Sequence, residues 1–367
     1  MSKFLISVPG KVLLLGGYAV LLGKKGFALA LNDNKGLGFL AEAYNSAKEE
    51  IKSSYFYADL SCKEDIENYK HEPAVFSYLI AKEWHMKKFK KFKKARIDIK
   101  GNKIFGIQNA KTGLGGSACS IVSSIMSVFA VNETIYEFLN DAHGLCFKSA
   151  FMLNKNASGY DIATSLYGTC IYRKYMKKDK KGGIFNAVNI KCNELKQNFL
   201  ILNIKGKSTD TKKSISAFMQ ALEERGGGVK KVINQQSLIE HEIMKLFIQD
   251  NENRGQNYFD MKAMSYKLID KKRELNKFML KYGADEVVPD EVYGFLKNLR
   301  ELKAISGCFI TGAGGYDNIA IILNKHALKG LKAFDKLKDE IISKSEFDIE
   351  FLDVMQDNSG ARFYEIQ

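Results

Sequence analysis

The sequence predicts an α+β protein of two domains. Short apolar segments with strand character are mixed with long amphipathic segments of helical period, and no internal repeat is visible. The chain has 367 residues, a length typical of two domains. Its composition changes at a strand-like segment, 198–206, after which long amphipathic helices follow. We therefore expect one domain over 1–195 and a second over 196–367.

The first domain is expected to open with two apolar strands and a glycine turn. The elements expected after this opening are a strand at 36–44, a mixed loop and strand region at 45–70, a helix at 71–94, a strand at 95–102, a glycine loop and apolar helix at 111–132, a helix at 134–153, a turn and helix at 156–168, and a strand at 169–175. Pro73 suits the first turn of the helix at 71–94, since its missing N–H has no helical partner there.

The second domain is expected to begin with the strand at 198–206. Amphipathic helices are expected at 211–224, 229–250, 258–282 and 290–305. A glycine loop then separates a strand from an apolar run within 307–323, and the tail at 326–367 is expected to form a helix and then a strand.

Composition excludes several classes of protein. Hydrophobic residues make up 46% and charged residues 27%, which is typical of a globular protein. No apolar run reaches the roughly 18–20 residues of a membrane span, and the apolar patch near the N-terminus is too short for a signal peptide. The six cysteines form no CxxC and the five histidines lack ligand spacing, so a zinc site is not expected. We expect a soluble, cytoplasmic protein.

The net charge of +14 raises nucleic-acid binding as an alternative. Basic residues cluster at 82–103 and 173–181. The chain has 49 lysines but only 7 arginines, whereas base-reading proteins favour arginine because its planar fork pairs bidentately with guanine. Solvated lysine faces are therefore the favoured interpretation, and neither a nucleic acid nor a membrane is an expected partner.

The segment KTGLGGSACS at 111–120 has the composition of a phosphate-binding loop. Glycine lets the backbone approach an anion, and the first N–H groups of the following helix point at it. An ordinary, tightly packed loop is the alternative. A Walker A motif is excluded because Ile201 stands where GKS at 206–208 requires a glycine. The formal dinucleotide match from Gly113 to Ala118 lacks the acidic residue about 20 residues further on.

Four segments in order resemble the motifs of the GHMP small-molecule kinases. They are VPGKVLLLGGYAVL at 8–21, KTGLGGSACS at 111–120, ASGYDIATSLYG at 157–168 and GCFITGAGGYDNIAIIL at 307–323. The resemblance implies the two-domain fold of that superfamily. Its N-terminal α+β domain binds ATP, and its C-terminal domain is a ferredoxin-like α+β domain with added helices.

Within the superfamily, the sequence most resembles the phosphomevalonate kinases of the eukaryotic type. The similar features are Lys111 directly before Thr112 and Gly113, the SGYD and GAGGYD turns, and GKSTDTKK at 206–213. Two positions depart from the family pattern. Gly116 stands where that family usually has a first serine, and Ala157 stands where glycine is common.

The resemblance implies transfer of the ATP γ-phosphoryl group to (R)-5-phosphomevalonate, with Mg²⁺, to give the 5-diphosphate and ADP. It implies catalytic roles for Lys11 and Asp161, and it makes Ser117 the metal ligand. The ATP-binding residues that it implies are Lys111, Gly113, Leu114, Gly115, Gly116, Ser117 and Ala118. The substrate-binding residues that it implies are Lys11, Tyr18, Ser158, Gly159, Asp161, Lys207, Ser208, Thr209, Gly312, Gly314 and Gly315.

Several alternatives remain open from the sequence. Within the superfamily they are mevalonate kinase, another member, or the related diphosphomevalonate decarboxylase. Outside it they are the basic nucleic-acid-binding protein and a degenerate relative without activity, although Lys11, Ser117 and Asp161 argue against degeneracy. A small-molecule substrate and a monomer or weak dimer are expected. Ser208 and Thr209 are expected at a helix start, either as caps of that helix or as part of an anion site.

Overall fold

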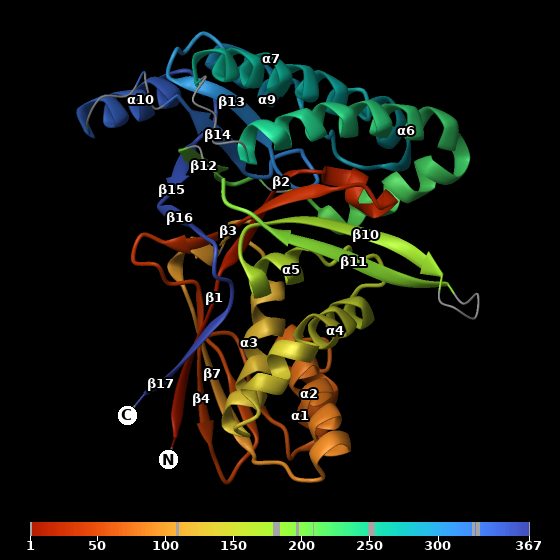
Figure 1. Ribbon diagram of the computed structural model, residues 1–367, viewed down its shortest axis with the longest axis vertical. Helices are drawn as coiled ribbons and strands as arrows, with labels where there is room; N and C mark the ends of the chain where they lie inside the picture. The colour runs from red at the N-terminus through yellow and green to blue at the C-terminus, as the bar shows by residue number, and fades with distance from the viewer. Residues whose placement is uncertain are drawn as a thin grey trace. The chain divides into compact units, whose positions relative to one another are not determined.

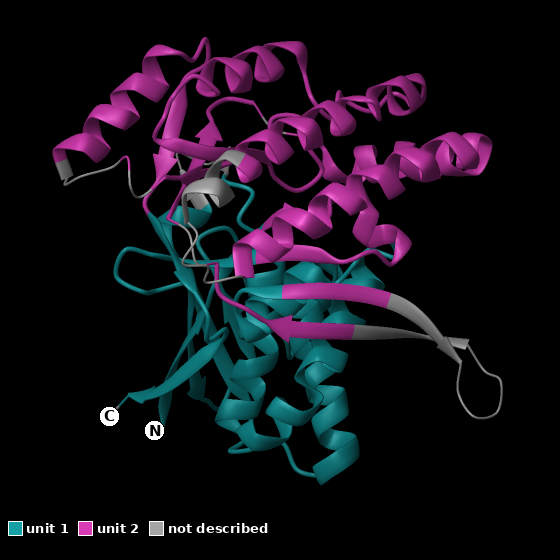
Figure 2. Ribbon diagram, turned by 45° about the horizontal axis from the view of Figure 1, so that its top comes forward, with its two compact units in different colours: residues 1–12, 29–170, 354–367 teal, residues 13–28, 171–353 magenta. Residues whose placement is uncertain are grey.

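The computed structural model describes residues 2–107, 110–178, 184–195, 198–207, 209–248, 254–324, 327 and 331–366. The chain divides into two compact units. Unit 1 contains residues 1–12, 29–170 and 354–367, and unit 2 contains residues 13–28 and 171–353 (Figure 2). Each unit therefore draws on segments that lie far apart in the sequence.

Unit 1 contains a six-stranded sheet in the order β17-β1-β4-β7-β5-β6 (Figure 1). Its strands are β1 (Lys3–Val8), β4 (Phe39–Asn45), β5 (Glu50–Lys52), β6 (Tyr57–Asp59), β7 (Ala95–Gly101) and β17 (Arg362–Ile366). All neighbours are antiparallel except β5 and β7, which are parallel. The C-terminal strand β17 thus pairs directly with the first strand of the chain.

The helices of unit 1 are α1 (Lys63–Tyr69), α2 (Pro73–Phe89), α3 (Gly116–Val131), α4 (Ile135–Leu153) and α5 (Tyr160–Tyr167). Nearly every side chain of α3 after its first turn is buried, as expected for a helix that is apolar on all sides. Val122 and Ile125 of α3 share one core with Ile6, Ala41 and Ile97 of the sheet. This core fixes the position of the glycine loop, because that loop leads directly into α3.

Unit 2 contains a four-stranded antiparallel sheet in the order β13-β14-β12-β15. The strands are β12 (Phe199–Ile204), β13 (Ile305–Ile310), β14 (Ile319–Leu323) and β15 (Ile349–Leu352). Helices separate β12 from β13 and β14 from β15, while β13 and β14 form a hairpin. This order and connectivity are those of a ferredoxin-like fold. The predicted α+β fold with a ferredoxin-like second part is confirmed.

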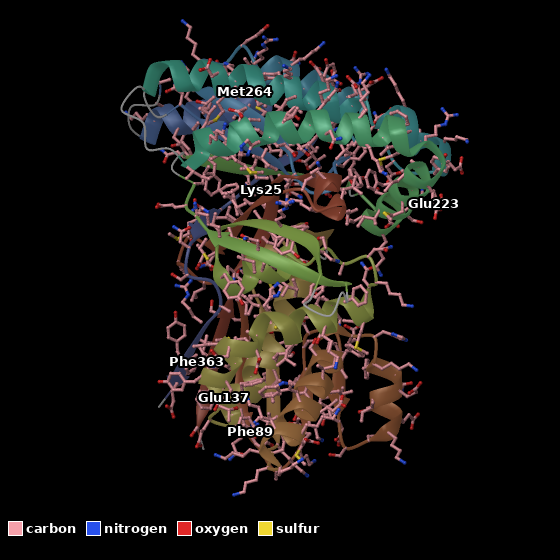
Figure 3. The ribbon with its side chains drawn as sticks, turned by 45° about the vertical axis from the view of Figure 1, so that its right-hand side comes forward. Lys25, Phe89, Glu137, Glu223, Met264 and Phe363 are labelled. Atoms are coloured by element: carbon pink, nitrogen blue, oxygen red, sulfur yellow. The ribbon has the colours of Figure 1, made fainter. Side chains whose placement is uncertain are left out.

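The helices of unit 2 are α6 (Thr211–Ile248), α7 (Arg254–Arg273), α8 (Asn276–Met279), α9 (Asp290–Leu299) and α10 (Leu331–Ser343), with a 3-10 turn η3 (Leu280–Tyr282). The backbone of α6 is non-helical at Arg225, where the helix kinks. The sequence predicted two helices on either side of this position, 211–224 and 229–250. The side chain of Glu223, just before the kink, is exposed (Figure 3).

The remaining strands and 3-10 turns complete the described chain. They are β2 (Gly10–Leu15), η1 (Gly17–Leu22), β3 (Gly26–Asp33), η2 (Lys103–Phe105), β8 (Gly106–Ile107), β9 (Ala110–Lys111), β10 (Cys170–Lys178), β11 (Ile184–Cys192) and β16 (Val354–Asp357). Along the chain, β2, β3 and β10 each begin in one unit and end in the other. The last four residues of β3 pair with β16 within unit 1.

Several sequence expectations differ from the structure. The strand β3 was not predicted, although residues 26–32 are all buried, because a run that is apolar on both faces lacks the alternation of a half-buried strand. The region 45–70 contains the helix α1 as well as strands. The helix expected at 290–305 ends at Leu299. The compact units also do not follow one division near residue 195, because β16 and β17 pair with strands of unit 1.

The basic stretch at 82–103 forms the end of α2 and the whole of β7. Several of its cations pair with carboxylates: Lys82 with Glu49 at 2.6 Å and Lys93 with Glu133 at 2.6 Å. An aromatic ring of α2 also contacts one of its lysines, since the Lys88 ammonium lies 4.5 Å from the centre of the Trp84 ring. These contacts fit the interpretation of a solvated lysine face. Of the second cluster, residues 179–181 lie outside the described residues.

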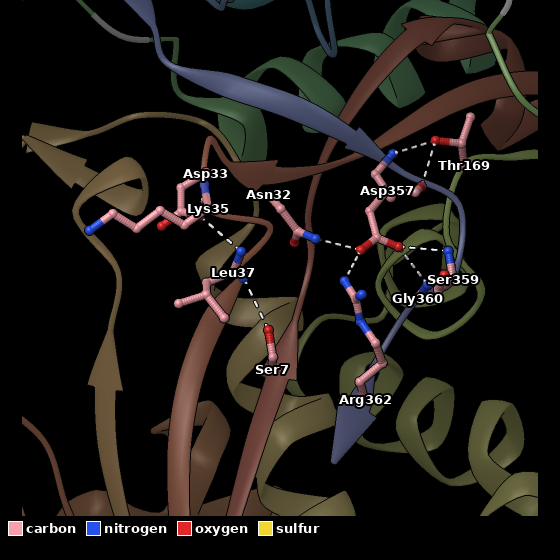
Figure 4. Close-up of polar contacts among 12 residues, drawn as sticks. Ser7, Asn32, Asp33, Lys35, Leu37, Thr169, Asp357, Ser359, Gly360 and Arg362 are labelled. Atoms are coloured by element: carbon pink, nitrogen blue, oxygen red, sulfur yellow. Dashed lines mark hydrogen bonds and ion pairs between the residues drawn. The ribbon is translucent and has the colours of Figure 1, made fainter. Parts of the chain in front are cut away.

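The carboxylate of Asp357 joins the C-terminal segment to the rest of unit 1 (Figure 4). It accepts hydrogen bonds from the Asn32 amide and the Arg362 guanidinium. Its second oxygen accepts from the backbone N–H groups of Ser359 at 2.7 Å and Gly360 at 2.8 Å. The Asp357 side chain is only 3% exposed. One buried carboxylate thus fixes the turn between β16 and β17, because it accepts hydrogen bonds from the turn itself, from β17 and from β3.

We expect Asp357→Ala to lower the free energy of unfolding by about 3 kcal/mol, because it leaves buried donors and a guanidinium without their acceptor. Asp348→Asn is the control, since Asp348 is 72% exposed in its pair with Lys205 and should change stability by less than about 1 kcal/mol. Urea denaturation measures both. Equal, small effects of the two substitutions would show that Asp357 does not hold the C-terminal turn.

Candidate active site

The turn from Pro9 to Lys11 joins β1 to β2 and lies against the glycine loop in unit 1. The backbone N–H of Lys11 donates to the carbonyl oxygen of Leu114 at 2.8 Å. The Lys11 ammonium donates to the carbonyl oxygen of Gly113 at 3.2 Å. Two segments about 100 residues apart in sequence are therefore joined through both the backbone and the side chain of one lysine.

Gly115 allows this contact because it has no side chain. A Cβ atom built at Gly115 would lie 2.8 Å from Cε and 2.9 Å from Cγ of Lys11, well inside van der Waals contact. The φ angle of Gly115 is also +83°, in the left-handed region where other residues are strained. Both observations require glycine at this position, and they place the alkyl chain of Lys11 directly over the loop.

The first turn of α3 follows Gly115. Gly115 is its N-cap residue and supplies no side-chain hydrogen bond to the helix N–H groups. Ser117 is exposed in the first turn, while Ala118 is buried. A helix start with exposed N–H groups and a hydroxyl attracts anions through the helix dipole and these donors. The backbone of Lys111 forms part of β9, just before the loop.

The SGYD turn lies beside the same lysine. Gly159 has a φ of +85° and caps the helix α5, which begins at Tyr160. The Lys11 ammonium lies 5.5 Å from the centre of the Tyr160 ring. Asp161 is in the first turn of α5, where its Oδ1 accepts from the backbone N–H of Ile162 at 2.9 Å. The structure therefore brings the lysine turn, the glycine loop and the SGYD turn together within unit 1.

Two buried side chains lie under the lysine turn. The Cys119 thiol and the Ser165 hydroxyl both donate to the carbonyl oxygen of Pro9, at 3.4 and 3.2 Å. Burial raises the pKa of the Cys119 thiol to about 12, the Ser165 hydrogen bond and Lys11 lower it, and Asp161 raises it. The charges of Lys11 and Asp161 therefore act on the same small region, while the thiol stays protonated at neutral pH.

The third glycine loop lies in unit 2, next to the end of the first motif. The backbone N–H of Gly312 donates to the carbonyl oxygen of Leu13 at 2.9 Å, and that of Gly315 donates to Val287 at 2.8 Å. Gly312, Gly314 and Gly315 all have positive φ angles. Tyr18, which follows the first motif's glycines, is 5% exposed and stacks on Phe218 with 4.9 Å between ring centres.

Thr209 holds the third glycine loop. Its hydroxyl donates to the carbonyl oxygen of Gly314 at 2.9 Å and accepts from the backbone N–H of Tyr316 at 2.9 Å. A Cβ at Gly315 would lie 2.3 Å from this hydroxyl, so glycine is required there as well. The expectation that Thr209 opens the helix is corrected. The helix begins at Thr211, and Asp210 caps it by accepting from the N–H of Lys213 at 3.0 Å.

Lys207 makes an ion pair with Glu291, which also accepts a hydrogen bond from the Tyr316 hydroxyl. The ammonium lies 4.4 Å from the centre of the Tyr316 ring. Glu291, in the first turn of α9, was not singled out from the sequence, and a separation of 84 positions between the two residues leaves no local signal. Ser208, between Lys207 and Thr209, lies outside the described residues.

The similarity to known proteins covers most of the chain. No family model matches it. A curated relative, the phosphomevalonate kinase of Saccharolobus solfataricus, is 25% identical over 329 residues, which are 87% of this chain and 90% of the relative. Within the parts of the chain that the structure describes, no helix is long and apolar enough to cross a membrane.

Solved structures share the fold over nearly the whole chain. A protein from Listeria innocua has a TM-score of 0.75 at 17% identity, covering 100% of this chain and 99% of that one. The phosphomevalonate kinase of Streptococcus pneumoniae, in complex with phosphomevalonate and AMPPNP, has a TM-score of 0.68 at 15% identity and covers 96% and 99%. The mevalonate kinase of Methanococcus jannaschii has a TM-score of 0.62 at 14% identity and covers 96% and 98%. The resemblance predicted from the four motifs is confirmed, and the fold of the chain is that of the GHMP kinase superfamily.

Proposed function

We propose that the chain is a phosphomevalonate kinase, which transfers the γ-phosphoryl group of ATP to (R)-5-phosphomevalonate and releases ADP. The broader assignment, an ATP-dependent GHMP kinase of the mevalonate pathway, is supported by the curated relative and by the kinases that share the fold. The finer assignment is supported by two of them. The relative from Saccharolobus solfataricus is a phosphomevalonate kinase, and the solved enzyme from Streptococcus pneumoniae binds phosphomevalonate.

The position of Lys11 is the observation that carries the proposal. Phosphoryl transfer requires that donor and acceptor are aligned and that negative charge is stabilised as they approach. In this reaction both partners are anions, so a cation is needed where they meet. Lys11 lies on the glycine loop beside the SGYD turn, at 3.2 Å from Gly113 O and 5.5 Å from the Tyr160 ring. We assign it the task of offsetting their repulsion.

Asp161 is assigned an orienting role. A phosphate acceptor is already ionised near neutral pH, so a strong general base is not needed. In the first turn of α5, a carboxylate near Lys11 can hold the lysine and the acceptor in line. Ser158 and Gly159 of the same turn are proposed to contact the acceptor.

The start of α3 fits the ATP phosphates and Mg²⁺. Its N-cap residue Gly115 offers no side-chain cap, and Ser117 presents an exposed hydroxyl in the first turn. We propose that the loop from Lys111 to Ala118 holds the phosphates and that Ser117 ligates the metal ion. When bound, Mg²⁺ would neutralise phosphate charge; the chain's own part is to orient the phosphates with backbone N–H groups.

The residues proposed to bind the acceptor in unit 2 are Tyr18, Lys207, Ser208, Thr209, Gly312, Gly314 and Gly315. Thr209 also has a structural role, because its hydroxyl forms two hydrogen bonds with the third glycine loop. Tyr18 is buried against Phe218, so its contribution to binding would come through packing. Lys207 has the charge to select a phosphorylated acceptor.

Measuring ADP release with Mg-ATP and three separate acceptors tests the proposal. We expect turnover with 5-phosphomevalonate and at least about 100-fold lower kcat/KM with mevalonate, a difference of the size that one charged contact provides. Preference for mevalonate would identify a mevalonate kinase instead. Release of CO₂ and phosphate from 5-diphosphomevalonate would identify the decarboxylase. No turnover with any acceptor would refute all three.

We expect Lys11→Ala to lower kcat by an amount equivalent to about 2–4 kcal/mol, because the charge that Lys11 neutralises grows as the two anions approach. Asp161→Asn should also be severe, and the losses of the double variant should be far from additive, since the two side chains act as one unit. Steady-state kinetics on all three variants, with thermal unfolding in parallel, is the measurement. Additive losses, or normal turnover in either folded single variant, would refute the pairing.

Gly115→Ala should lower kcat about 100-fold, because a Cβ there displaces the Lys11 side chain and strains the backbone. Gly144→Ala is the matched control. Gly144 is an exposed position in α4 with nothing within 4 Å of the added Cβ, so alanine should leave kcat unchanged and stabilise the helix slightly. Normal kcat in Gly115→Ala would show that the Lys11 position is not needed for turnover.

Variants of Lys207 and Glu291 should change acceptor binding in opposite directions. Lys207→Ala removes a positive charge and should raise the KM for 5-phosphomevalonate about three- to five-fold, whereas Glu291→Gln releases that charge from its partner and should lower KM. The KM for ATP should change in neither. A change of the same sign in both variants would indicate that the ion pair serves the fold of unit 2 and does not bind the acceptor.

A further inference from the structure

Two charged residues of unit 2 occupy positions where helical periodicity calls for apolar ones. In α6, Glu240 continues the buried stripe of Val229, Ile233, Gln236, Ile243 and Phe247. In α7, Lys272 continues a stripe that contains Met261, Ser265, Leu268 and Ile269. Glu240 is 1% exposed and Lys272 is 5% exposed. Ionisable side chains this deeply buried need partners, so their contacts indicate what they do.

Glu240 binds the turn that follows the first motif. Its Oε1 accepts from the backbone N–H of Gly16 at 2.9 Å. Gly16 has a φ of +115°, and a Cβ there would lie 2.8 Å from Gly26 Cα, so this position requires glycine. Among the described residues, Oε2 of Glu240 is buried without a hydrogen-bond partner. The next residue, Gly17, lies against the third glycine loop, since a Cβ on it would be 3.5 Å from the carbonyl oxygen of Gly312.

Lys272 binds the strand end that leads into the third glycine loop. Its ammonium donates to the carbonyl oxygen of Ile310, the last residue of β13, at 2.8 Å. It also interacts electrostatically with Glu240 and with Asp317. Asp317 belongs to that loop, because its Oδ2 accepts from the backbone N–H of Ala313 at 3.2 Å. Lys272 therefore lies between the carboxylate that holds one turn and the carboxylate that holds the other.

The electrostatics of the two residues depend on each other. Burial raises the pKa of Glu240, and the nearby Lys272 and the Gly16 hydrogen bond oppose this rise. Burial lowers the pKa of Lys272, and Glu240 and Asp317 oppose this fall. Removing one member would leave the other as a buried charge with less compensation.

We propose that Glu240 and Lys272 are positioning residues, which hold the Gly16–Gly17 turn and the start of the third glycine loop in one fixed arrangement within unit 2. The proposal rests on the proposed kinase function, in which that loop binds the acceptor. Neither residue is assigned a contact with substrate. Their effect is carried by the Gly16 N–H bond and by the Ile310 bond.

The double variant Glu240→Leu/Lys272→Met tests this directly. Replacing a buried charged pair by apolar side chains of similar volume is often neutral for stability, because no lone charge remains. Both loop bonds are nevertheless lost. Gln236→Leu is the matched control, since Gln236 lies one helical turn earlier in α6, is 3% exposed, and donates its hydrogen bond at 2.9 Å to Lys271 O of α7 and not to a loop.

Hydrogen exchange of the protein without substrates, followed by mass spectrometry, is the first measurement. We expect exchange in segments 13–18 and 310–316 to become about ten-fold faster or more in the double variant and to stay unchanged in Gln236→Leu. Unchanged exchange in those segments would overturn the proposal. This readout needs no turnover, so it remains decisive even when none of the three acceptors proves to be a substrate and the proposed function itself fails.

Kinetics with the acceptor that the wild-type protein uses is the second measurement. We expect kcat of the double variant to fall about ten-fold or more, at unchanged KM for ATP, while Gln236→Leu keeps normal kcat at a comparable unfolding temperature. Faster exchange with normal kcat would overturn the positioning role. Should the double variant not fold, Glu240→Gln/Lys272→Gln takes its place, since it also leaves no lone buried charge. Its shorter amide at position 272 loses the Ile310 bond, so the same changes are expected in 310–316 and in kcat.

Discussion

Lys11 and the glycine loop constrain each other. The lysine is bound at its backbone by Leu114 and at its ammonium by Gly113, and its alkyl chain fills the space that a side chain at Gly115 would occupy. The loop in turn leads into α3, whose buried residues belong to the main core of unit 1. An unrestrained surface lysine would lose rotamer freedom on binding an anion, whereas the side chain of Lys11 is already held in place. The core thus determines where the positive charge lies.

The sequence predicted the elements whose pattern is local. The apolar helix after the glycine loop, the strand at 198–206 and the two helices on either side of Arg225 all follow from periodicity and glycine placement. The strand β3 was missed because both of its faces are buried, and its partner β16 lies far away in the sequence. The C-terminal strands were anticipated as strand, but their pairing with unit 1 depends on Asp357 and its distant partners.

The candidate site, like the fold, was predicted from the sequence only in part. Glycine spacing indicated the loops, and the resemblance supplied Lys11 and Asp161; in the structure the charges of both act on the buried thiol of Cys119. What the sequence could not reveal are pairings between elements. Thr209 is engaged with the third glycine loop rather than with a helix start, and Lys207 is paired with Glu291 from α9. A lysine's charge can be read from the sequence, but the carboxylate that neutralises it cannot.

Glu240 and Lys272 had a signal in the sequence, since each interrupts an apolar stripe of helical period. Such an interruption normally weakens a helix–helix contact, because burying an ion costs several kcal/mol even after relaxation. In unit 2 the two ions do more than compensate each other's charge, because each also binds a backbone group at a glycine-rich turn. Glycine turns have few side-chain contacts with which to fix their conformation. The buried side chains of Glu240 and Lys272 supply that missing restraint, which explains why two ionisable groups lie in the core of unit 2 next to glycine-rich turns.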